Sequence, residues 1–351
     1  MSFESRRCGR GFILVGVIWT LAIFTVLATG ATLWMDRYLT QVEARRQAFQ
    51  RELEERSMLA RVQWLVATQR YTVAGLTVPH AEELPVVEMD RSVLPVGDEL
   101  PLDGRLLCLD NGWCVALVDH ASRVSLTNSD PGLLRALLVA LGVSVEDAGV
   151  MVSDWLAYFR PPTGPRLGSL GGGGDWGGSG SPRQRVVHSV MEVFRLASWQ
   201  VWEDQLMAAN WPDLVTAEAV ALNFNTVHPK VLALVRGGTL EDAEAFPSAR
   251  RVRPIMQQSE LRGFLGQQAE YIPFEAWTRL ASDTLAVRLF PIGATQMSEY
   301  DLRFNSNHIL LPPWQRLAKR SINQDGPDNN PVFTPGMVPD VLSSPLVAGP
   351  G

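Results

Sequence analysis

The chain has 351 residues, of which 46% are hydrophobic and 19% are charged, so it can bury a sizeable core and is neither disordered nor collagen-like. Its 31 basic and 37 acidic residues give a formal net charge of −6, which disfavours a protein that binds nucleic acid or an anionic membrane surface through a broad charged face. Three cysteines are too few for a disulfide scaffold. At roughly 100 to 200 residues per domain, the length predicts about two domains.

The first expected element is an apolar helix over residues 12–34. These residues contain no charged side chain, and as a helix they would extend about 34 Å, enough to cross a hydrocarbon core of about 30 Å. The arginines of residues 1–11 keep that leader in the cytoplasm and place the rest of the chain outside it. A signal peptide cleaved near Ala28 is one alternative, although its apolar region is usually only about 7 to 15 residues long. A simple uncleaved anchor is the other.

Helical periodicity continues beyond residue 34 to about Arg70, now with an amphipathic pattern. Arg51 with Glu55, and Glu52 with Arg56, form i,i+4 pairs of opposite charge that support a solvated helix face. The sequence therefore predicts one continuous helix, apolar in its first half and amphipathic in its second. Such a helix can sit in a membrane or in a filament and still hold a soluble head.

A basic leader that ends in Gly11, followed by Phe12 at the start of a long apolar helix, resembles the type IV pilins and the type II secretion pseudopilins. In those proteins a prepilin peptidase cuts after the glycine and methylates the new N-terminus. The resemblance thus implies cleavage between Gly11 and Phe12, and Cys8 would leave with the leader. Most of these proteins carry a glutamate at the fifth mature position, which is Gly16 here, and the minor pseudopilin K typically lacks it.

Residues 104–120 predict a β-hairpin. Two β-rich runs flank Asp110-Asn111-Gly112, and Gly112 can supply the positive φ of a three-residue loop. With that loop, Cys108 faces Cys114, and directly opposed Cβ atoms lie about 4.5 to 5.5 Å apart. An oxidising extracytoplasmic compartment then favours a Cys108–Cys114 disulfide over the alternative of two buried thiols.

Two later segments share one pattern at an offset of 98 residues: a short extended piece, a polar stretch, a proline and an apolar helix. The prolines are Pro131 and Pro229, each in the first turn of its helix. The polar side chains are expected to accept the unpaired N–H groups of those helices, a capping role that we favour over a catalytic one. They are Thr127 and Asn128 in the first segment and Asn223, Asn225 and Thr226 in the second.

Each segment continues through a glycine turn, at Gly142 and at Gly237-Gly238, into a second expected helix, which is the outline of a helix-hairpin-helix unit. Such a unit can bind DNA when the N–H groups of the turn face a phosphate. The alternative function is therefore a membrane-anchored, extracytoplasmic DNA-binding protein of a competence-like pilus. Acidic residues follow both turns and would repel phosphate: Glu146, Asp147, Glu241, Asp242 and Glu244.

Together, the leader, the long helix, both proline-containing segments and residues 193–199 resemble the minor pseudopilin K family of type II secretion systems. The resemblance implies an α+β fold with a long N-terminal transmembrane and stem helix. It also implies a pseudopilin-type antiparallel sheet that carries a large inserted α-helical domain with two helix-hairpin-helix-like units. It implies a place at the pseudopilus tip with minor pseudopilins I and J as partners, in the inner membrane with a periplasmic head.

The corresponding domain boundaries follow the chain. They are a cytoplasmic leader over 1–11, the transmembrane part of the helix over 12–34, its amphipathic continuation over 35–75, the first part of the sheet over 76–125, the inserted helical domain over 126–280, the second part of the sheet over 281–320, and a disordered tail over 321–351.

The resemblance to the family allows a bound calcium ion, but the acidic ligands that it would need are largely missing here. Family members commonly have an acidic stretch after an Asp-Trp pair, but after Asp154-Trp155 the residues 156–185 contain a single acidic residue, Asp175. Calcium takes six to eight oxygen ligands, including several carboxylates, so this stretch cannot hold it. The glycine-rich residues 171–178 predict a flexible loop and lack the Gly-Lys-Ser/Thr ending of a phosphate loop.

No catalytic or cofactor motif stands out. The five histidines are scattered without metal-ligand spacing: His80, His120, His188, His228 and His308. There is no Gly-x-Ser-x-Gly elbow and no His-Glu-x-x-His sequence. The expected function is assembly rather than catalysis, with no cofactor, with prepilin peptidase as a processing partner and without nucleic acid.

Overall fold

The computed structural model describes residues 10–78, 94–97, 99–159, 187–236, 250, 253–257, 260, 277–305, 312–323 and 342. The chain divides into two compact units, residues 1–57 and residues 58–351. The first unit holds most of the N-terminal helix, and the second is the head.

The N-terminal helix α1 spans Arg10–Thr68. It is long and apolar enough to cross a membrane, with a mean hydropathy of 2.1 in its most apolar window, and no part of that window is buried inside the protein. Its polar side chains there are satisfied within the helix: the hydroxyls of Thr20, Thr25, Thr29 and Thr32 donate to carbonyls of the preceding turn at 2.8–2.9 Å. This part of the helix therefore suits an apolar surrounding on all sides.

The last turns of α1 belong to the head. Met58, Leu59, Val62, Leu65 and Val66 recur at helical spacing and are all buried. They pack in one core cluster with inward-facing residues of the sheet. The amphipathic half of the helix thus ends as one wall of the head's core.

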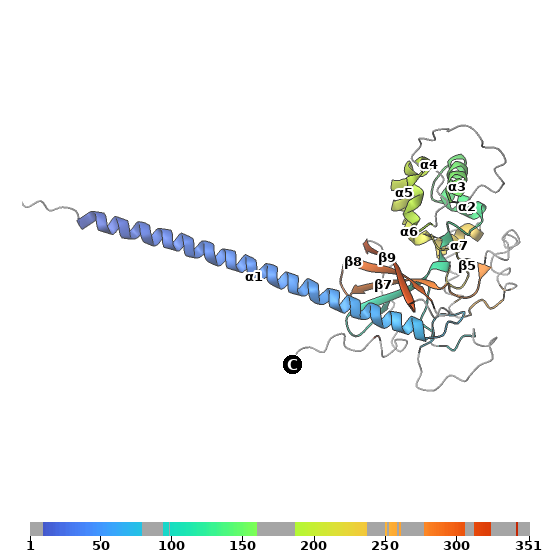
Figure 1. Cartoon of the computed structure of the whole chain (residues 1–351), viewed down its shortest axis with the longest axis horizontal. Coiled ribbons are helices and arrows are strands. Elements are labelled where there is room, and N and C mark those ends of the chain that lie inside the picture. The colour runs from blue at the N-terminus through green and yellow to red at the C-terminus, as the bar shows by residue number, and fades with distance from the viewer. Residues whose placement is uncertain are drawn as a thin grey trace, which may run out of the picture. The chain divides into compact units, whose positions relative to one another are not determined.

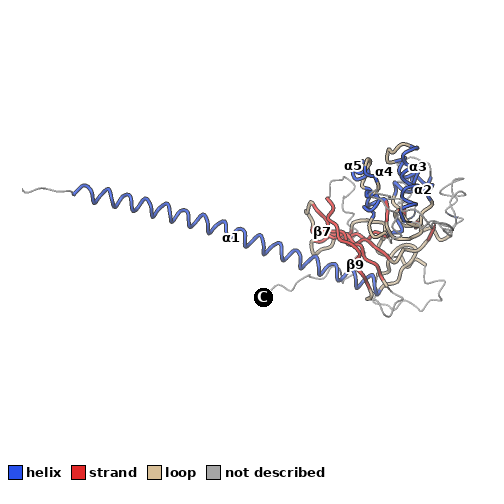
Figure 2. The backbone as a smooth tube through the Cα atoms, turned by 45° about the horizontal axis from the view of Figure 1, so that its top comes forward, coloured by secondary structure: helices blue, strands red, loops and turns tan. Residues whose placement is uncertain are grey.

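The head's main sheet has five antiparallel strands in the order β1-β2-β7-β8-β9. In Figure 2 the strands are the red parts of the tube, and β7 and β9 of this sheet are labelled. The strands are β1 (Leu107–Cys108), β2 (Trp113–Asp119), β7 (Thr284–Pro291), β8 (Gln296–Phe304) and β9 (Trp314–Asn323). Because β2 and β7 are direct neighbours, with Asp119 opposite Leu285, all residues between them form an insertion into the sheet.

The insertion is mainly helical (Figure 1). It has its own hydrophobic core. Trp155, Trp199 and Trp211 are fully buried in it, and the indole N–H groups of the first two donate to the carbonyls of Leu126 and Met151 at 2.7 and 2.8 Å. Its described elements are η2 (His120–Ser122), β3 (Val124–Ser125), α2 (Pro131–Ala140), α3 (Val145–Phe159), η3 (Val190–Arg195), α4 (Ala197–Gln200), α5 (Glu203–Ala208), α6 (Trp211–Leu214), β4 (Val215–Thr216), β5 (Leu222–Asn223), α7 (Pro229–Arg236) and β6 (Trp277–Thr278).

The expected α+β fold is confirmed: a long apolar N-terminal helix, an antiparallel sheet and a helical insertion. The helix ends at Thr68, close to the expected end at about Arg70 and before the domain boundary at residue 75. One expected boundary is wrong. The tail expected from residue 321 begins too early, because β9 pairs with β8 through Asn323 and Leu342 is buried in the sheet core. The second helix expected after Gly237-Gly238 lies outside the described residues.

Candidate functional site

The expected processing site lies in the first turn of α1, which includes Gly11 and Phe12. Its cleavage and methylation stay predictions, since nothing in the fold bears on them. The described residues of the head, by contrast, define the surroundings of the other expected sites.

The hairpin at residues 107–119 contains the disulfide. The backbone N–H of Leu109 donates to the carbonyl of Trp113 at 2.8 Å, and Gly112 has a φ of +83° in the turn. This register places Cys108 opposite Cys114, and their sulfur atoms are bonded at 1.98 Å. Both cysteines are buried, so the bond closes the hairpin inside the head rather than on its surface.

Thr127 and Asn128 do not cap α2, so their expected role is wrong. The cap is Asp130, whose Oδ2 accepts from the N–H of Gly132 at 3.1 Å. The backbone N–H groups of Thr127 and Asn128 donate instead to Ser125 Oγ. The physical reason is position: a helix that begins at Pro131 takes its cap from the residue directly before it.

The second segment shows the same difference. At the start of α7, the N–H of Lys230 donates to His228 Nδ1 at 3.2 Å, so the residue before Pro229 again fills the cap position. Asn225 lies in a loop, where its side-chain amide bonds the N–H and carbonyl of Ile255 at 2.8 and 3.1 Å. The side chains of Asn223 and Thr226 point elsewhere, to a buried carboxylate.

That carboxylate is Asp119, the last residue of β2, and it is fully buried. Its Oδ2 accepts from Asn223 Nδ2 at 3.1 Å and from Thr226 Oγ1 at 3.0 Å. Its Oδ1 accepts from the N–H of Ala121 at 2.9 Å, and from the N–H and hydroxyl of Ser282 at 3.0 and 2.7 Å. Asp119 therefore binds the beginning, the middle and the end of the insertion at one point of the sheet. The sequence signals this role of Asp119 only weakly, as one acidic residue at the end of an apolar strand.

A buried ionic cluster also joins the insertion to the sheet. Arg288 of β7 bonds Glu299 of β8 at 2.6 Å and Asp213 of α6 at 2.7 Å. Arg320 of β9 bonds the same two carboxylates at 2.7 Å each, and Arg123 reaches Glu299 at 3.5 Å. Burial alone would raise the pKa of Glu299, but the three arginines outweigh it and hold that pKa well below its usual range. The cluster is therefore ionised when the head is folded.

His120 is a third link between the insertion and the sheet. Its contacts resemble a relay of hydroxyl, imidazole and carboxylate groups. Thr216 Oγ1 lies 2.8 Å from His120 Nδ1, and His120 Nε2 lies 3.1 Å from Asp301 Oδ1. Thr216 also accepts the N–H of Glu218 at 3.1 Å, and it is only 1% exposed. The threonine hydroxyl is therefore already bonded within the head, where it ties β4 of the insertion to the sheet through His120.

The turn between α2 and α3 does not offer its N–H groups to a phosphate. The N–H of Gly142 donates to the carbonyl of Val139, and that of Val143 to Leu138, both at 3.0 Å. Gln205 Nε2 covers the carbonyl of Leu141 at 2.7 Å. The first turn of α3 carries Glu146 and Asp147. The geometry required for helix-hairpin-helix binding of DNA is absent at this turn, and the second turn lies outside the described residues.

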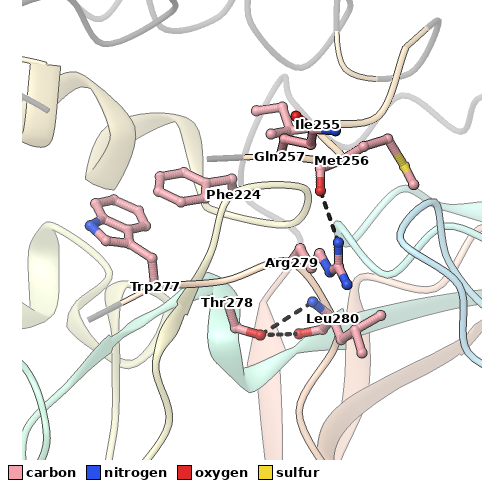
Figure 3. Close-up of a pocket in the computed structure, with 8 residues that line it drawn as sticks. All are labelled: Phe224, Ile255, Met256, Gln257, Trp277, Thr278, Arg279 and Leu280. Carbon is pink, nitrogen blue, oxygen red and sulfur yellow. Dashed lines mark hydrogen bonds between the residues drawn. The ribbon is translucent and has the colours of Figure 1, made fainter. Parts of the chain in front are cut away.

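A pocket of about 490 Å³ lies beside the second segment (Figure 3). The rings of Phe224 and Trp277 stack with their centres 3.6 Å apart, and Arg279 donates to the carbonyl of Met256 at 3.1 Å. Residues 261–276, which precede Trp277, lie outside the described part of the chain. We therefore assign no ligand to this pocket.

No metal-ligand cluster of three or more His, Cys, Asp or Glu side chains occurs among the described residues. Asp154, where the calcium site of the resembled family would begin, accepts a hydrogen bond from the hydroxyl of Ser198 at 2.6 Å. The residues that follow it, 160–186, are outside the described part. The single acidic residue of that stretch does not fit a calcium site, and none is proposed.

One solved structure that resembles the chain comes from a bacterial secretion machine. It is a chain of the GspK–GspI–GspJ complex from the type 2 secretion system of enterotoxigenic Escherichia coli. The match covers 82% of this chain and 99% of that chain, with a TM-score of 0.41 and 11% sequence identity, a level that carries no argument about function. No protein-family model and no curated protein matches the chain.

Proposed function

We propose that the chain is a minor pseudopilin that initiates or caps the pseudopilus of a type II secretion machine and so supports protein export across the outer membrane. The observation that carries the proposal is the architecture. An apolar N-terminal helix continues into the core of an antiparallel sheet, and a helical domain is inserted between the neighbouring strands β2 and β7. The leader ending at Gly11 supports the same assignment from the sequence.

The proposed mechanism is assembly without catalysis. Residues 12–34 hold the protomer in the inner membrane, with the head in the periplasm, until the helix packs beside those of other pseudopilins. Gly16 supplies no carboxylate to pair with the N-terminus of a protomer above it, and the inserted domain obstructs further stacking. Both features suit a subunit at the tip.

The proposed partners are minor pseudopilins I and J, together with prepilin peptidase as the processing enzyme. Copurification tests them. Full-length chain expressed with these two pseudopilins should come out of detergent as a complex. Expression of the same chain without them gives the background, and failure to recover any complex would count heavily against the proposal.

Mass analysis of the N-terminus is the most direct test. Protein extracted from membranes of cells with prepilin peptidase should begin at methylated Phe12. Gly11→Leu should leave the leader attached, whereas Gly9→Leu, a matched change in the same leader, should be processed normally. A mature chain beginning near Ala31 would instead identify a secreted protein with a cleaved signal peptide.

A further inference from the structure

β9 (Trp314–Asn323) is an edge strand of the main sheet. It pairs with β8 along its whole length, and no other strand pairs with it within the described part of the chain. An edge strand presents a row of N–H and C=O groups to which another extended chain can bind. Here that row extends over ten residues.

A groove of about 640 Å³ follows this free side of the strand. Seven consecutive residues of β9, Leu317–Asn323, line it on one side, and residues of the insertion, including Met191 and Met207, line the other. Two carboxylates also line it, those of Glu218 and Asp301, and each is already paired within the head, with Arg303 and with His120. Successive side chains of a strand point to opposite faces, so a run of consecutive lining residues shows that the groove follows the backbone edge. At about 3.3 Å per residue, seven residues give a length of about 20 Å.

The groove has a different character on each face of the sheet. The pairing of β8 with β9 shifts by one residue at Leu317. Arg316 therefore lies opposite Leu302, and Ala318 lies opposite Asp301. Arg316, which directly precedes the lining residues, is thereby brought to the same face as Lys319, which lines the groove and lies over the ring of Tyr300. Both side chains are exposed. On the other face the insertion forms the wall, where Met191 and Met207 are 39% and 40% exposed.

The strand is also one-sided in charge. Its ten residues include Arg316, Lys319 and Arg320 and no acidic residue. Two copies of β9 placed edge to edge would set cations beside cations, which is unfavourable, so a second copy of the chain is not the expected occupant. Leu342, the one residue described after β9, lies elsewhere: its carbonyl accepts from Asn111 Nδ2 at 2.8 Å, in the hairpin at the opposite side of the sheet.

We infer that this groove binds an extended acidic segment of a partner protein, which adds to β9 as a sixth strand. Alternate side chains of that segment would be acidic, toward Arg316 and Lys319, and apolar, toward Met191 and Met207. Backbone hydrogen bonds supply the affinity and the two faces supply the selectivity. The inference stands on the groove alone, so its failure would leave the processing test of the proposed function unaffected.

A designed peptide can serve as the probe. A blocked octapeptide of alternating glutamate and valine would be added to the full-length protein in detergent, and hydrogen exchange of the β9 amides would be measured. The amides facing the groove should become protected, and the same peptide with lysine in place of glutamate should protect them far less. Equal protection by both peptides, or by neither, would overturn the inference, as would protection that depends on protein concentration alone, because that identifies self-association.

Matched variants separate the groove from the rest of the surface. The double variant Arg316→Glu/Lys319→Glu should weaken binding of the acidic peptide about tenfold, because two pairs of opposite charge become pairs of like charge. Arg253→Glu, whose side chain is 83% exposed on the insertion, is its control. Met191→Asp should also weaken binding, whereas Val201→Asp, at an 82% exposed residue that does not line the groove, should not. Unchanged affinity in variants that unfold at the wild-type temperature would refute the site.

Discussion

At the scale of single residues, buried polar groups hold the insertion on the sheet. Asp119 accepts hydrogen bonds from both ends of the insertion, at Ala121 and Ser282, and from its middle through Asn223 and Thr226. A buried carboxylate is costly unless its oxygens are fully bonded, and here five donors meet that requirement. Replacing it leaves those donors buried without a partner.

We therefore expect Asp119→Ala to lower the free energy of unfolding by about 3 kcal/mol, because charge-assisted hydrogen bonds are lost and their donors stay buried. Urea unfolding monitored by tryptophan fluorescence would measure it. Asp130→Ala, which removes only the exposed cap of α2, should cost about 1 kcal/mol. Equal losses in the two variants would show that Asp119 has no special role at the junction.

The contact region between the insertion and the sheet should also be sensitive to acid. Burial lowers the pKa of His228 from its ordinary 6.5 to about 4, outweighing the opposite effect of Asp213. Because the folded state disfavours protonated His228, stability is expected to fall as the pH drops below 6.5 toward 4. Glu299, whose folded pKa is depressed, contributes stability above its ordinary pKa of 4.5 that is lost at lower pH.

Melting temperatures measured from pH 7 to pH 4 would test this. The first part of the decline, between pH 6.5 and about 4.5, should flatten in His228→Gln, which has no charge to gain. His188→Gln is a suitable control because His188 is an exposed histidine. A decline of the same slope in both variants would show that other groups control the acid sensitivity.

At the scale of elements, local sequence patterns predicted the hairpin correctly but did not predict which residues cap the helices. The hairpin followed from turn chemistry, because Asp110-Asn111-Gly112 fixes the register that sets Cys108 against Cys114. The polar residues before Pro131 and Pro229 had two possible uses, and sequence spacing could not choose between them. The competing use, bonding to Asp119 and to Ile255, depends on residues distant in the sequence.

The disulfide should contribute measurably to the hairpin. Cys108 and Cys114 are six residues apart. A bond that closes so short a loop lowers the conformational entropy of the unfolded chain, which stabilises the folded state by about 2 kcal/mol. Cys108→Ala/Cys114→Ala should lose about that amount in chemical unfolding. Intact mass analysis after thiol alkylation should show no free thiol in the processed wild type; two alkylated thiols would disprove the bond.

The loop after α1 has little tolerance for a side chain. At Gly75, with φ of +151°, an added Cβ would lie 2.1 Å from the carbonyl oxygen of Leu100, which accepts the N–H of Leu76. We expect Gly75→Ala to cost more than about 2 kcal/mol, because backbone must move. At Gly97, φ is +116° but a Cβ would have no neighbour within 4 Å, so Gly97→Ala should cost only about 1 kcal/mol of conformational strain. The difference between the two unfolding free energies isolates the clash.

At the scale of the whole molecule, the sequence predicted that a helical domain interrupts the sheet. It did not predict the contacts that hold this insertion on the sheet. The expected insertion ran over residues 126–280, and the flanking strands end at Asp119 and resume at Thr284. The ties are pairings between distant residues, such as Arg288 with Asp213 and His120 with Asp301. No local periodicity signals them, since each partner read alone is an ordinary charged residue of a strand or helix.

The separation of the two cores predicts that the sheet can fold without the insertion. One core cluster consists of residues of the insertion. The other contains the last turns of α1 and the inner face of the sheet. Since Asp119 and Leu285 are direct partners, replacing residues 120–284 with Asn-Gly should close β2 and β7 into a tight hairpin.

Circular dichroism of this shortened chain should retain the strand signal, with cooperative melting at a lower temperature than the wild type, because the bonds of Asp119 to the insertion and those of Asp213 to the sheet are lost. Glu299 keeps Arg288 and Arg320 as partners, so it is not left as an unpaired buried charge. Adding Glu299→Ala to the shortened chain should therefore destabilise it further, by leaving both arginines without that carboxylate. A shortened chain that melts without cooperativity would mean that the insertion is part of the sheet's own folding unit.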